Sequence, residues 1–350
     1  MRKIDVLIVD DSGFQRILLQ NALRGDPRVG KIRFGRDGLD AVQKTMKLSP
    51  DVVILDIIMP KMDGIAALKE IMRKKPTPVL LLSALSRDQV DKALSGGLDG
   101  GAIDFLQKPT DKNKWLHSQQ QILLRKVIAA AQANVKRLGS SIIADKVSGL
   151  QSDQKIKSLA LRQRVIVFAS STGGPQALRL IFSQFPQATP PILAIQHMAE
   201  GFTNSLAKSL NSGSKIQVKE AQDGFLLQPS TALVAPGGDC HMNLSPKPYP
   251  SVSLMSGPLV NFVRPAADVT MTSATNIYGT GVLGVILTGM GSDGLEGAWA
   301  IKNGGGKIIA EAPESCVVKS MPSKVIDAGL ADLVVPKEEI AAAIRQLSWF

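Results

Sequence analysis

Residues 52–64 read VVILDIIMPKMDG, and the apolar run that opens this stretch indicates the architecture of the N-terminal part of the chain. A short, continuous apolar run that ends in an acidic residue is typical of a strand buried on both faces of a parallel sheet. Similar runs occupy residues 4–9, 78–83 and 102–109, and helical patterns occupy residues 13–24, 37–48 and 64–74. This alternation predicts a doubly wound α/β sheet whose functional site lies at the carboxyl ends of the strands.

Charged side chains mark the ends of these expected strands. Asp10 and Asp11 follow the first run, Asp56 closes the run at 52–56, and Lys108 follows the last run. Because neighbouring strand ends converge in such a sheet, three carboxylates and one ammonium group would share a crevice. Clustered carboxylates attract a hard cation such as Mg²⁺, and an aspartate beside Mg²⁺ and a lysine is suited to accept a phosphoryl group. Taken singly, the paired aspartates would serve equally well as a helix N-cap.

The combination of DD at 10–11, LDIIMPKMDG at 55–64, Ser83 and KP at 108–109 resembles the two-component receiver domain over residues 1–125. The resemblance implies a flavodoxin-like fold in which Asp56 is the phosphorylation site. It also implies that Asp10, Asp11, Asp56 and the backbone carbonyl of Ile58 hold Mg²⁺, that Lys108 contacts the phosphoryl group, and that Ser83 hydrogen-bonds to it. Phe105 occupies the position of the family's switch aromatic residue, where tyrosine is also common.

The pattern of the chain changes after the receiver-like part. The helix-prone QQQILLRKVIAAAQANVKRL is followed by the polar, Ser-rich SSIIADKVSGLQSDQKIKS, which has no sustained hydrophobic period. Such a composition is typical of an exposed linker. We therefore expect a first domain at 1–125, a linker at 126–160 and a second domain at 161–350.

A second series of strands and helices begins with RVIVFASSTGGP at residues 164–175. Its apolar half predicts a buried strand, and Pro175 suits the first turn of the helix that follows. Further strands are expected at 191–196, 231–236, 282–289 and 307–312, and helices at 175–185, 265–277 and 293–303. The pattern predicts a second doubly wound, Rossmann-like domain.

Ser170, Ser171 and Thr172 lie at the turn from strand to helix in this stretch. A nucleophile is favoured at this turn, because a helix N-terminus stabilises an oxyanion. A phosphate-binding loop is the alternative, although neither G-x-G-x-x-G nor a P-loop lysine is present. His197 ends the strand at 191–196 and is the favoured general base, with His241 as a second candidate. Asp293 would orient that base, or would act only as an N-cap. The glycines that flank Met290 allow its amide to approach an oxyanion.

Five blocks of sequence resemble, in content and order, the C-terminal domain of the chemotaxis protein-glutamate methylesterases: ASSTGGPQAL, IQHMAEGFT, ALVAPGGDCHM, NFVRPAADV and LTGMGSDG. This family also has a receiver domain at its N-terminus, so the resemblance covers nearly the whole chain. The resemblance implies that Ser171 is the nucleophile, His197 the general base and Asp293 its orienting partner. Thr172 and the backbone of Met290 would belong to the surrounding site. The family's usual alanine before the nucleophile is a serine here, at position 170, which leaves open which of the two serines reacts.

The same resemblance implies an activity. The enzyme would hydrolyse glutamate methyl esters on methyl-accepting chemotaxis receptors, releasing methanol, and would need no cofactor for this step. Some family members also deamidate receptor glutamines. A chemotaxis-type histidine kinase would supply the phosphoryl group, and phosphorylation of Asp56 would release a receiver that covers the hydrolytic site. The alternative is a receptor-binding or adaptor module without turnover.

The net charge of +11 raises the question of nucleic-acid binding. Residues 1–125 hold 21 basic against 15 acidic residues, residues 126–160 hold 6 against 2, and residues 161–350 hold 14 against 13. A DNA-binding response regulator predicts a small helix-turn-helix output domain, whereas the second domain is long and nearly neutral. We therefore expect no nucleic-acid partner.

The remaining composition favours the cytoplasm, and we expect the protein to be a monomer. No apolar run approaches the roughly 20 residues that span a bilayer, and the N-terminus has no signal-peptide pattern. The two cysteines, Cys240 and Cys316, have no metal-binding spacing and fit a reducing compartment.

Overall fold

The structure is a computed structural model that describes residues 2–83, 87–108, 120–133, 135, 161–246 and 249–347. The chain divides into two compact units, Met1–Ser140 and Ser141–Phe350. Most of the expected linker, and Pro109 of the KP motif, lie outside the described residues.

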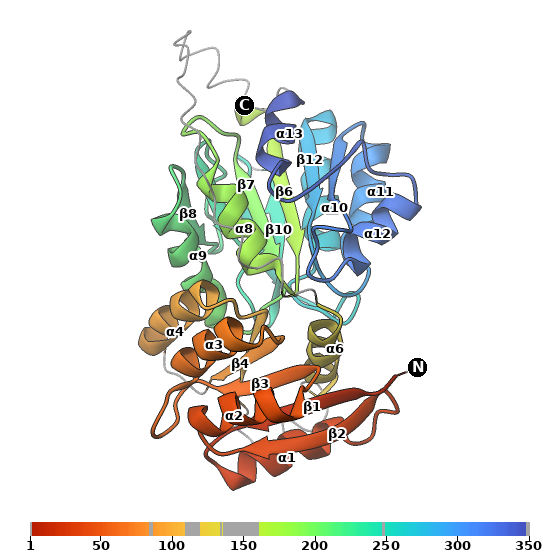
Figure 1. The fold of residues 1–350 in the computed structure, drawn as a ribbon. Helices are drawn as coiled ribbons and strands as arrows, with labels where there is room; N and C mark the ends of the chain where they lie inside the picture. The colour runs from red at the N-terminus through yellow and green to blue at the C-terminus, as the bar shows by residue number, and fades with distance from the viewer. Residues whose placement is uncertain are drawn as a thin grey trace. The chain divides into compact units, whose positions relative to one another are not determined.

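The first unit is a five-stranded parallel sheet in the order β2-β1-β3-β4-β5. Its strands are β1 Ile4–Val9, β2 Val29–Gly35, β3 Val52–Asp56, β4 Val79–Ser83 and β5 Asp104–Gln107. Its helices are α1 Gly13–Leu23, α2 Gly38–Leu48, α3 Gly64–Lys74, α4 Arg87–Asp99 and α6 Gln120–Ala131. Helix α1 packs with α6 on one face, and α3 packs with both α2 and α4 on the other (Figure 1). The predicted doubly wound sheet is confirmed, and this strand order is the flavodoxin-like one.

Three helices of this unit begin at side-chain caps. Ser12, Asp37 and Asp63 accept hydrogen bonds from the backbone N–H groups of Gln15, Asp40 and Ala66, respectively. The cap of α1 is therefore Ser12, which frees Asp10 and Asp11 from the capping role that their position also allowed.

Helix α6 extends past residue 125, where the first domain was expected to end. Its side chains Val127 and Ile128 are buried in the first unit, and Lys126 forms an ion pair of 2.6 Å with the buried Asp104 of β5. The first residues of the expected linker are thus part of a packed helix.

The second unit is a seven-stranded parallel sheet in the order β14-β13-β12-β6-β7-β9-β8. Its strands are β6 Val165–Ser170, β7 Ile192–Gln196, β8 Gln217–Glu220, β9 Thr231–Val234, β12 Val282–Ile286, β13 Lys307–Glu311 and β14 Leu333–Val335. Its helices are α8 Gly174–Ser183, α9 Phe202–Ser212, α10 Ala267–Tyr278, α11 Leu295–Asn303, α12 Ser320–Asp327 and α13 Ile340–Gln346, with a 3-10 turn at Gly279–Gly281. Helix α8 packs with α9 and α13, and α11 packs with α10 and α12, so that helices cover both faces of the sheet (Figure 1). The second doubly wound domain is also confirmed.

The strands are all parallel, but the chain adds them on one side of β6 first and on the other side later, starting with the neighbouring strand β12. From β6 the chain moves outward through β7, and it later returns to β12 on the opposite side of β6. Such a switch point opens a crevice at the carboxyl ends of the strands, where ligands bind in doubly wound folds. The five strands predicted in this unit were found within a few residues of their expected bounds.

The main element that the sequence did not predict is an antiparallel hairpin, β10 Cys240–Ser245 and β11 Ser251–Ser256. It packs on α10, where Thr270 Oγ1 donates to the Met242 carbonyl at 2.6 Å. The hairpin places the segment around His241 beside the start of α10.

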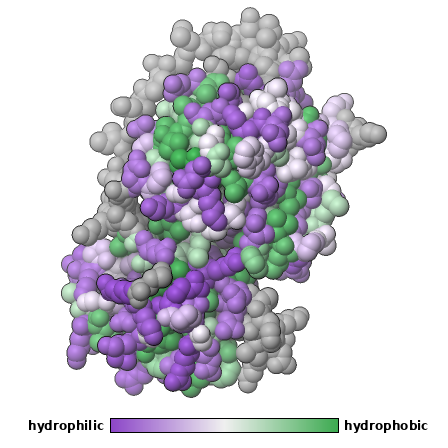
Figure 2. Space-filling model, turned by 90° about the vertical axis from the view of Figure 1, so that its right-hand side faces the viewer, coloured by the Kyte–Doolittle hydropathy of each residue, from purple (hydrophilic) through white to green (hydrophobic). Residues whose placement is uncertain are grey.

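Figure 2 shows hydrophobic residues as small separate areas among hydrophilic ones on the face in view. Scattered apolar side chains of this kind are ordinary on globular surfaces. None of the described helices is both long enough and apolar enough to cross a bilayer.

Candidate functional site

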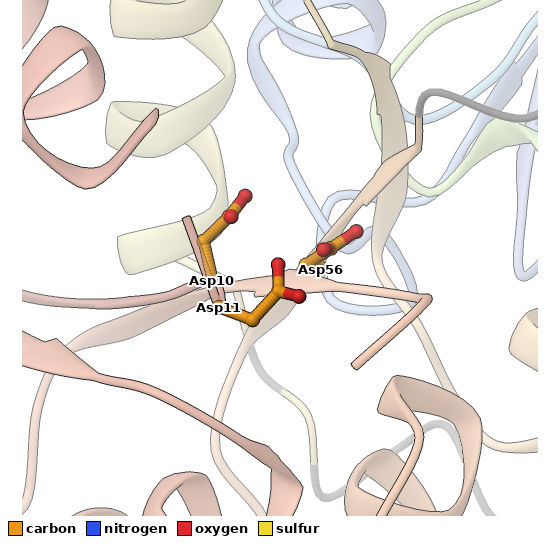
Figure 3. Close-up of side chains that lie close together, drawn as sticks. All are labelled: Asp10, Asp11 and Asp56. Carbon is orange, nitrogen blue, oxygen red and sulfur yellow. The ribbon is translucent and has the colours of Figure 1, made fainter. Parts of the chain in front are cut away.

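The first unit brings three carboxylates together at one end of its sheet. Asp10 and Asp11 follow β1, and Asp56 is the last residue of β3. Their side chains gather there, with one oxygen from each within 4.8 Å of the others (Figure 3). Asp10 and Asp56 are buried, whereas Asp11 is exposed. A compact group of carboxylate oxygens with one exposed member fits a Mg²⁺ ion.

Lys108 lies between two of these acids. Its Nζ is 2.7 Å from Asp10 Oδ2 and 2.6 Å from Asp56 Oδ2. Burial raises the pKa of Asp56 from 3.8 to about 6, because Lys108 offsets the loss of water only in part and Asp10 adds a like charge. Burial disfavours the charged form of Lys108 too, but its bonds to both carboxylates outweigh this and raise its pKa. The pocket therefore holds a permanent ammonium group beside a carboxylate that is costly to ionise.

The other residues predicted for this site lie on β4, on β5 and after β3. Ser83 is buried at the end of β4, and its carbonyl accepts a bond from the Lys108 amide. Phe105 is buried on β5, with its ring against Gly97 of α4. The Ile58 amide donates to Asp56 Oδ1 at 3.4 Å, and the Ile58 side chain is exposed.

In the second unit, Ser171 follows β6 in the turn that leads into α8. Its amide donates to the Thr288 carbonyl, and its own carbonyl accepts from Gly174. Gly173 has a φ of 84°, and side chains at Gly173 and Gly174 would collide with Val317 and Gln196, respectively. Both glycines face protein atoms, which favours the nucleophile turn over a phosphate-binding loop.

The two adjacent serines have different surroundings. Ser170 is fully buried as the last residue of β6, and its hydroxyl donates to Gln196 Oε1 at 2.7 Å. Gln196 Nε2 donates in turn to the Ser171 carbonyl at 2.9 Å. Ser170 thus holds an amide that supports the turn, which favours Ser171 as the nucleophile. Sequence reasoning missed Gln196; its place beside His197 at the end of β7 was the available signal.

His197 and Asp293 meet at the carboxyl ends of β7 and β12. His197 Nε2 lies 2.7 Å from Asp293 Oδ2, and both side chains are buried. Burial alone would raise the pKa of Asp293, but the bond and charge of His197 and two backbone amides outweigh it and lower the pKa. Asp293 is therefore ionised and accepts a hydrogen bond from Nε2–H. His197 Nδ1 is buried without a hydrogen-bond partner among the described residues, so its lone pair is available to accept a proton.

Asp293 does not cap the helix that follows it. The N-cap of α11 is Gly294, and the Asp293 carboxylate instead accepts from the amides of Ala267 and Asp268, at 2.6 and 3.1 Å, at the start of α10. Asp293 therefore does cap a helix, as its position suggested, but that helix is α10 and not α11. Asp268 was also missed by sequence reasoning, because nothing local indicates its contact across the chain.

His241 is held by both of its ring nitrogens. Nε2 lies 2.8 Å from the Pro258 carbonyl, and Nδ1 accepts from the Ala266 amide at 3.1 Å. Since the carbonyl can only accept, Nε2 carries the proton and neither nitrogen remains available as a base. This favours His197 over His241.

The segment after β12 packs against the nucleophile turn. A Cβ at Gly289 would lie 2.7 Å from Ser171 Cβ. Thr288 Oγ1 donates to the Thr172 carbonyl at 2.9 Å, and the Thr288 amide donates to the buried carboxyl of Glu311 at 2.8 Å. The Met290 backbone therefore follows a residue in direct contact with Ser171.

Comparison with known families assigns both units. Residues 6–119 match the response regulator receiver domain, and residues 166–344 match the CheB methylesterase. The DNA-binding response regulator that the charge suggested is excluded, because the output domain is of the methylesterase family.

Relatives match over the whole chain. A Thermotoga maritima protein-glutamate methylesterase/protein-glutamine glutaminase is 40% identical, covering 99% of this chain and 99% of its own. The protein of the same description from Pyrococcus horikoshii is 39% identical, with coverages of 98% and 93%. The crystal structure of the T. maritima CheB methylesterase catalytic domain is 43% identical, covers 53% of this chain and 98% of its own, and has a TM-score of 0.51. Two parallel-sheet units, with these sites at their strand ends and these relatives along their length, show that the chain belongs to the CheB methylesterase family and carries a response regulator receiver domain.

Proposed function

We propose that this chain is a phosphorylation-regulated protein-glutamate methylesterase, and also a protein-glutamine glutaminase, that acts on methyl-accepting chemotaxis receptors. The observation that carries the proposal is the ionised Asp293 on His197 Nε2, which leaves Nδ1 as a buried base at the strand ends where Ser171 lies. The relatives named above, which match over the full chain, support the same activity.

The geometry supports the following reaction. Ser171 attacks the ester carbonyl while His197 Nδ1 takes the hydroxyl proton, and Asp293 stabilises the imidazolium that results. The imidazolium then gives that proton to the departing methoxide, so that methanol leaves and an acyl-enzyme remains. Water, deprotonated by the same nitrogen, hydrolyses the acyl-enzyme and restores Ser171 and the glutamate. With a glutamine substrate the leaving group is ammonia.

The oxyanion of each tetrahedral intermediate requires hydrogen-bond donors. The Met290 amide is the proposed donor, because Gly289 brings this segment against Ser171. Thr172 belongs to the same site, since its carbonyl is fixed by Thr288. The Ser171 amide already donates to Thr288 and is not needed for this role. Hydrolysis needs no cofactor in this scheme.

The receiver, which includes α6 to Ala131, is the proposed regulator, and a linker joins it to the catalytic domain at 161–350. Asp56 accepts the phosphoryl group from a chemotaxis-type histidine kinase, and Asp10, Asp11, Asp56 and the Ile58 carbonyl would hold Mg²⁺. The cation, when bound, neutralises charge on the transferring oxygens. Lys108 and Ser83 then bind the phosphoryl oxygens, and Phe105 responds as the switch residue. Phosphorylation of Asp56 would relieve inhibition of the catalytic domain by the receiver. The proposed location is the cytoplasm, and the proposed state is a monomer without a nucleic-acid or inserted membrane partner.

Methanol release from methylated receptor membranes tests the activity. Ser171→Ala should abolish release, because it removes the hydroxyl that attacks the ester. The matched control Ser170→Ala should retain most of it, because the Ser170 hydroxyl is bound to Gln196. Release that persists in Ser171→Ala and is lost in Ser170→Ala would move the nucleophile. A wild-type protein that binds receptors but releases no methanol would be the adaptor module instead.

A small-molecule phosphodonor tests the regulation. Phosphodonor with Mg²⁺ should raise methanol release by the wild-type chain and leave Asp56→Asn at its basal rate. Equal stimulation of both proteins would exclude Asp56 as the phosphorylation site.

A further inference from the structure

We infer that Asp268 is a positioning residue for the reaction: it fixes the backbone from which Asp293 reaches His197. This inference rests on the proposed function. Neither the nucleophile nor the base touches Asp268, and no part of the mechanism above uses it.

Asp268 and Asp293 cap each other's helices. Asp293, just before α11, accepts from the amides of Ala267 and Asp268 at the start of α10. Asp268, in the first turn of α10, accepts through Oδ1 from the amides of Gly294 and Gly297 at the start of α11, at 2.8 and 2.7 Å. The two acids therefore form a crossed pair, in which each acid satisfies N–H groups that its partner's helix leaves open.

One of these bonds acts directly on the orienting acid. Gly294 follows Asp293 in the chain, so the bond from its amide to Asp268 fixes the peptide that carries Asp293. Both carboxylates are almost fully buried, with exposed fractions of 5% for Asp268 and 2% for Asp293. Loss of Asp268 would leave Gly294 and Gly297 amides without their acceptor in a buried place.

A third residue holds Asp268 from the loop before α10. Asn261 Nδ2 donates to Asp268 Oδ2 at 2.6 Å. Asn261 has a left-handed backbone with φ of 52°, a conformation that asparagine and aspartate tolerate better than most residues. Asp268 thus accepts hydrogen bonds from one side-chain amide and two helix amides, which fits a fixed carboxylate with a positioning role.

The arrangement allows a test by exchange of the two side chains. Asn261→Asp alone places two carboxylates against each other and should push Asp268 away from the α11 amides. Adding Asp268→Asn restores a donor and an acceptor: Asn at 268 accepts from Gly294 and Gly297 through its oxygen and donates its NH₂ to Asp at 261. The charge has moved, whereas the hydrogen bonds are the same in number and place.

Methanol release by the full chain gives the kinetic readout. Asp268→Ala and Asn261→Asp should each lower kcat roughly 10- to 100-fold, the range that an ångström of misplacement costs, with KM changed less than about twofold. The double variant Asn261→Asp/Asp268→Asn should return kcat to within about threefold of wild type. An unchanged kcat per folded molecule in Asp268→Ala, or a double variant no better than Asn261→Asp, would overturn the inference.

A second readout does not depend on turnover. The chain has three histidines, so the imidazole N–H resonance of His197 can be assigned in ¹⁵N-histidine-labelled protein by its loss in His197→Gln. The resonance should shift or broaden in Asn261→Asp and return in the double variant. If wild type releases no methanol but the resonance follows this pattern, the proposed function fails and the positioning role stands. A resonance that is unmoved in Asn261→Asp refutes the positioning role alone.

Discussion

Replacing Asp56 by asparagine should stabilise the receiver unit at neutral and alkaline pH. Asp56 has a pKa of about 6 in the folded unit, above its ordinary 3.8, chiefly because the carboxylate is buried. A raised pKa means that folding favours the protonated acid. The contribution of Asp56 to stability is therefore full below about pH 4 and is lost as the pH rises through 6. Asparagine keeps the shape of the side chain and removes the ionisation.

The magnitude follows from the two pKa values. Holding the pKa at about 6 in place of 3.8 costs the folded unit about 3 kcal/mol once the acid is ionised, and somewhat less where water reaches the pocket. The loss of the Lys108 partner is limited, because Lys108 keeps its bond of 2.7 Å to Asp10. Asp56→Asn should thus raise the free energy of unfolding by about 2–3 kcal/mol at pH 8 and by less than about 1 kcal/mol at pH 4.

Hydrogen exchange of the full chain across a urea series measures this effect. Peptides that contain β1 and β3 report on the receiver without separating it from the rest of the protein. The matched control is Asp63→Asn: Asp63 is an exposed cap of α3, and asparagine caps a helix equally well, so its stability change should be small at both pH values.

Two results would refute this reasoning. A gain of the same size at pH 4 and pH 8 would show that the effect does not come from the ionisation of Asp56. A loss of stability at pH 8 would show that the ion pair with Lys108 outweighs the burial of the carboxylate.

Mg²⁺ should stabilise the wild-type receiver against urea and stabilise Asp56→Asn much less, because the cation loses one of three carboxylate ligands. The same hydrogen-exchange experiment measures this, and equal stabilisation of both proteins would place the cation elsewhere. Gly289→Ala should lower kcat and cost about 1–3 kcal/mol of stability, since the added methyl group meets Ser171. Chemical denaturation measures the stability and methanol release measures kcat, and wild-type values of both quantities would show that the contact can relax. His197→Gln should abolish methanol release, whereas His241→Gln should lose about 1–3 kcal/mol of stability and keep release within about tenfold; similar losses of release in both variants would contradict the assignment of His197 as the base.

The architecture, and the clustering of the predicted site side chains at the strand ends, were predictable because parallel strands converge. A buried apolar run ending in a polar residue fixes both the strand and the edge of the sheet at which that residue lies, as for Asp56 in the first unit and His197 in the second. The sheet then brings together residues that are far apart in the chain, such as His197 and Asp293. Strand β2 was missed because its half-exposed side chains do not form a continuous apolar run.

Contacts set by loop geometry were not predictable. The choice between Ser170 and Ser171 depends on which side chain points into the sheet, and a shift of one residue reverses that direction. His241 was a plausible base in the sequence because neither the β10–β11 hairpin nor its contacts with Pro258 and Ala266 have a local signal. The link between Asp268 and α11 depends in the same way on how two helices begin side by side.

The crossed caps of α10 and α11 also have a consequence for how this part of the protein opens. Neither acid can reach its acceptor amides until both helices have formed, so the two sets of bonds form and break together. Local unfolding of α10 would release the first amides of α11, and with them the peptide of Asp293. We therefore expect the two helix starts to open as one cooperative unit, so that a molecule in which either start has frayed would lose the proposed positioning of Asp293 before it unfolds.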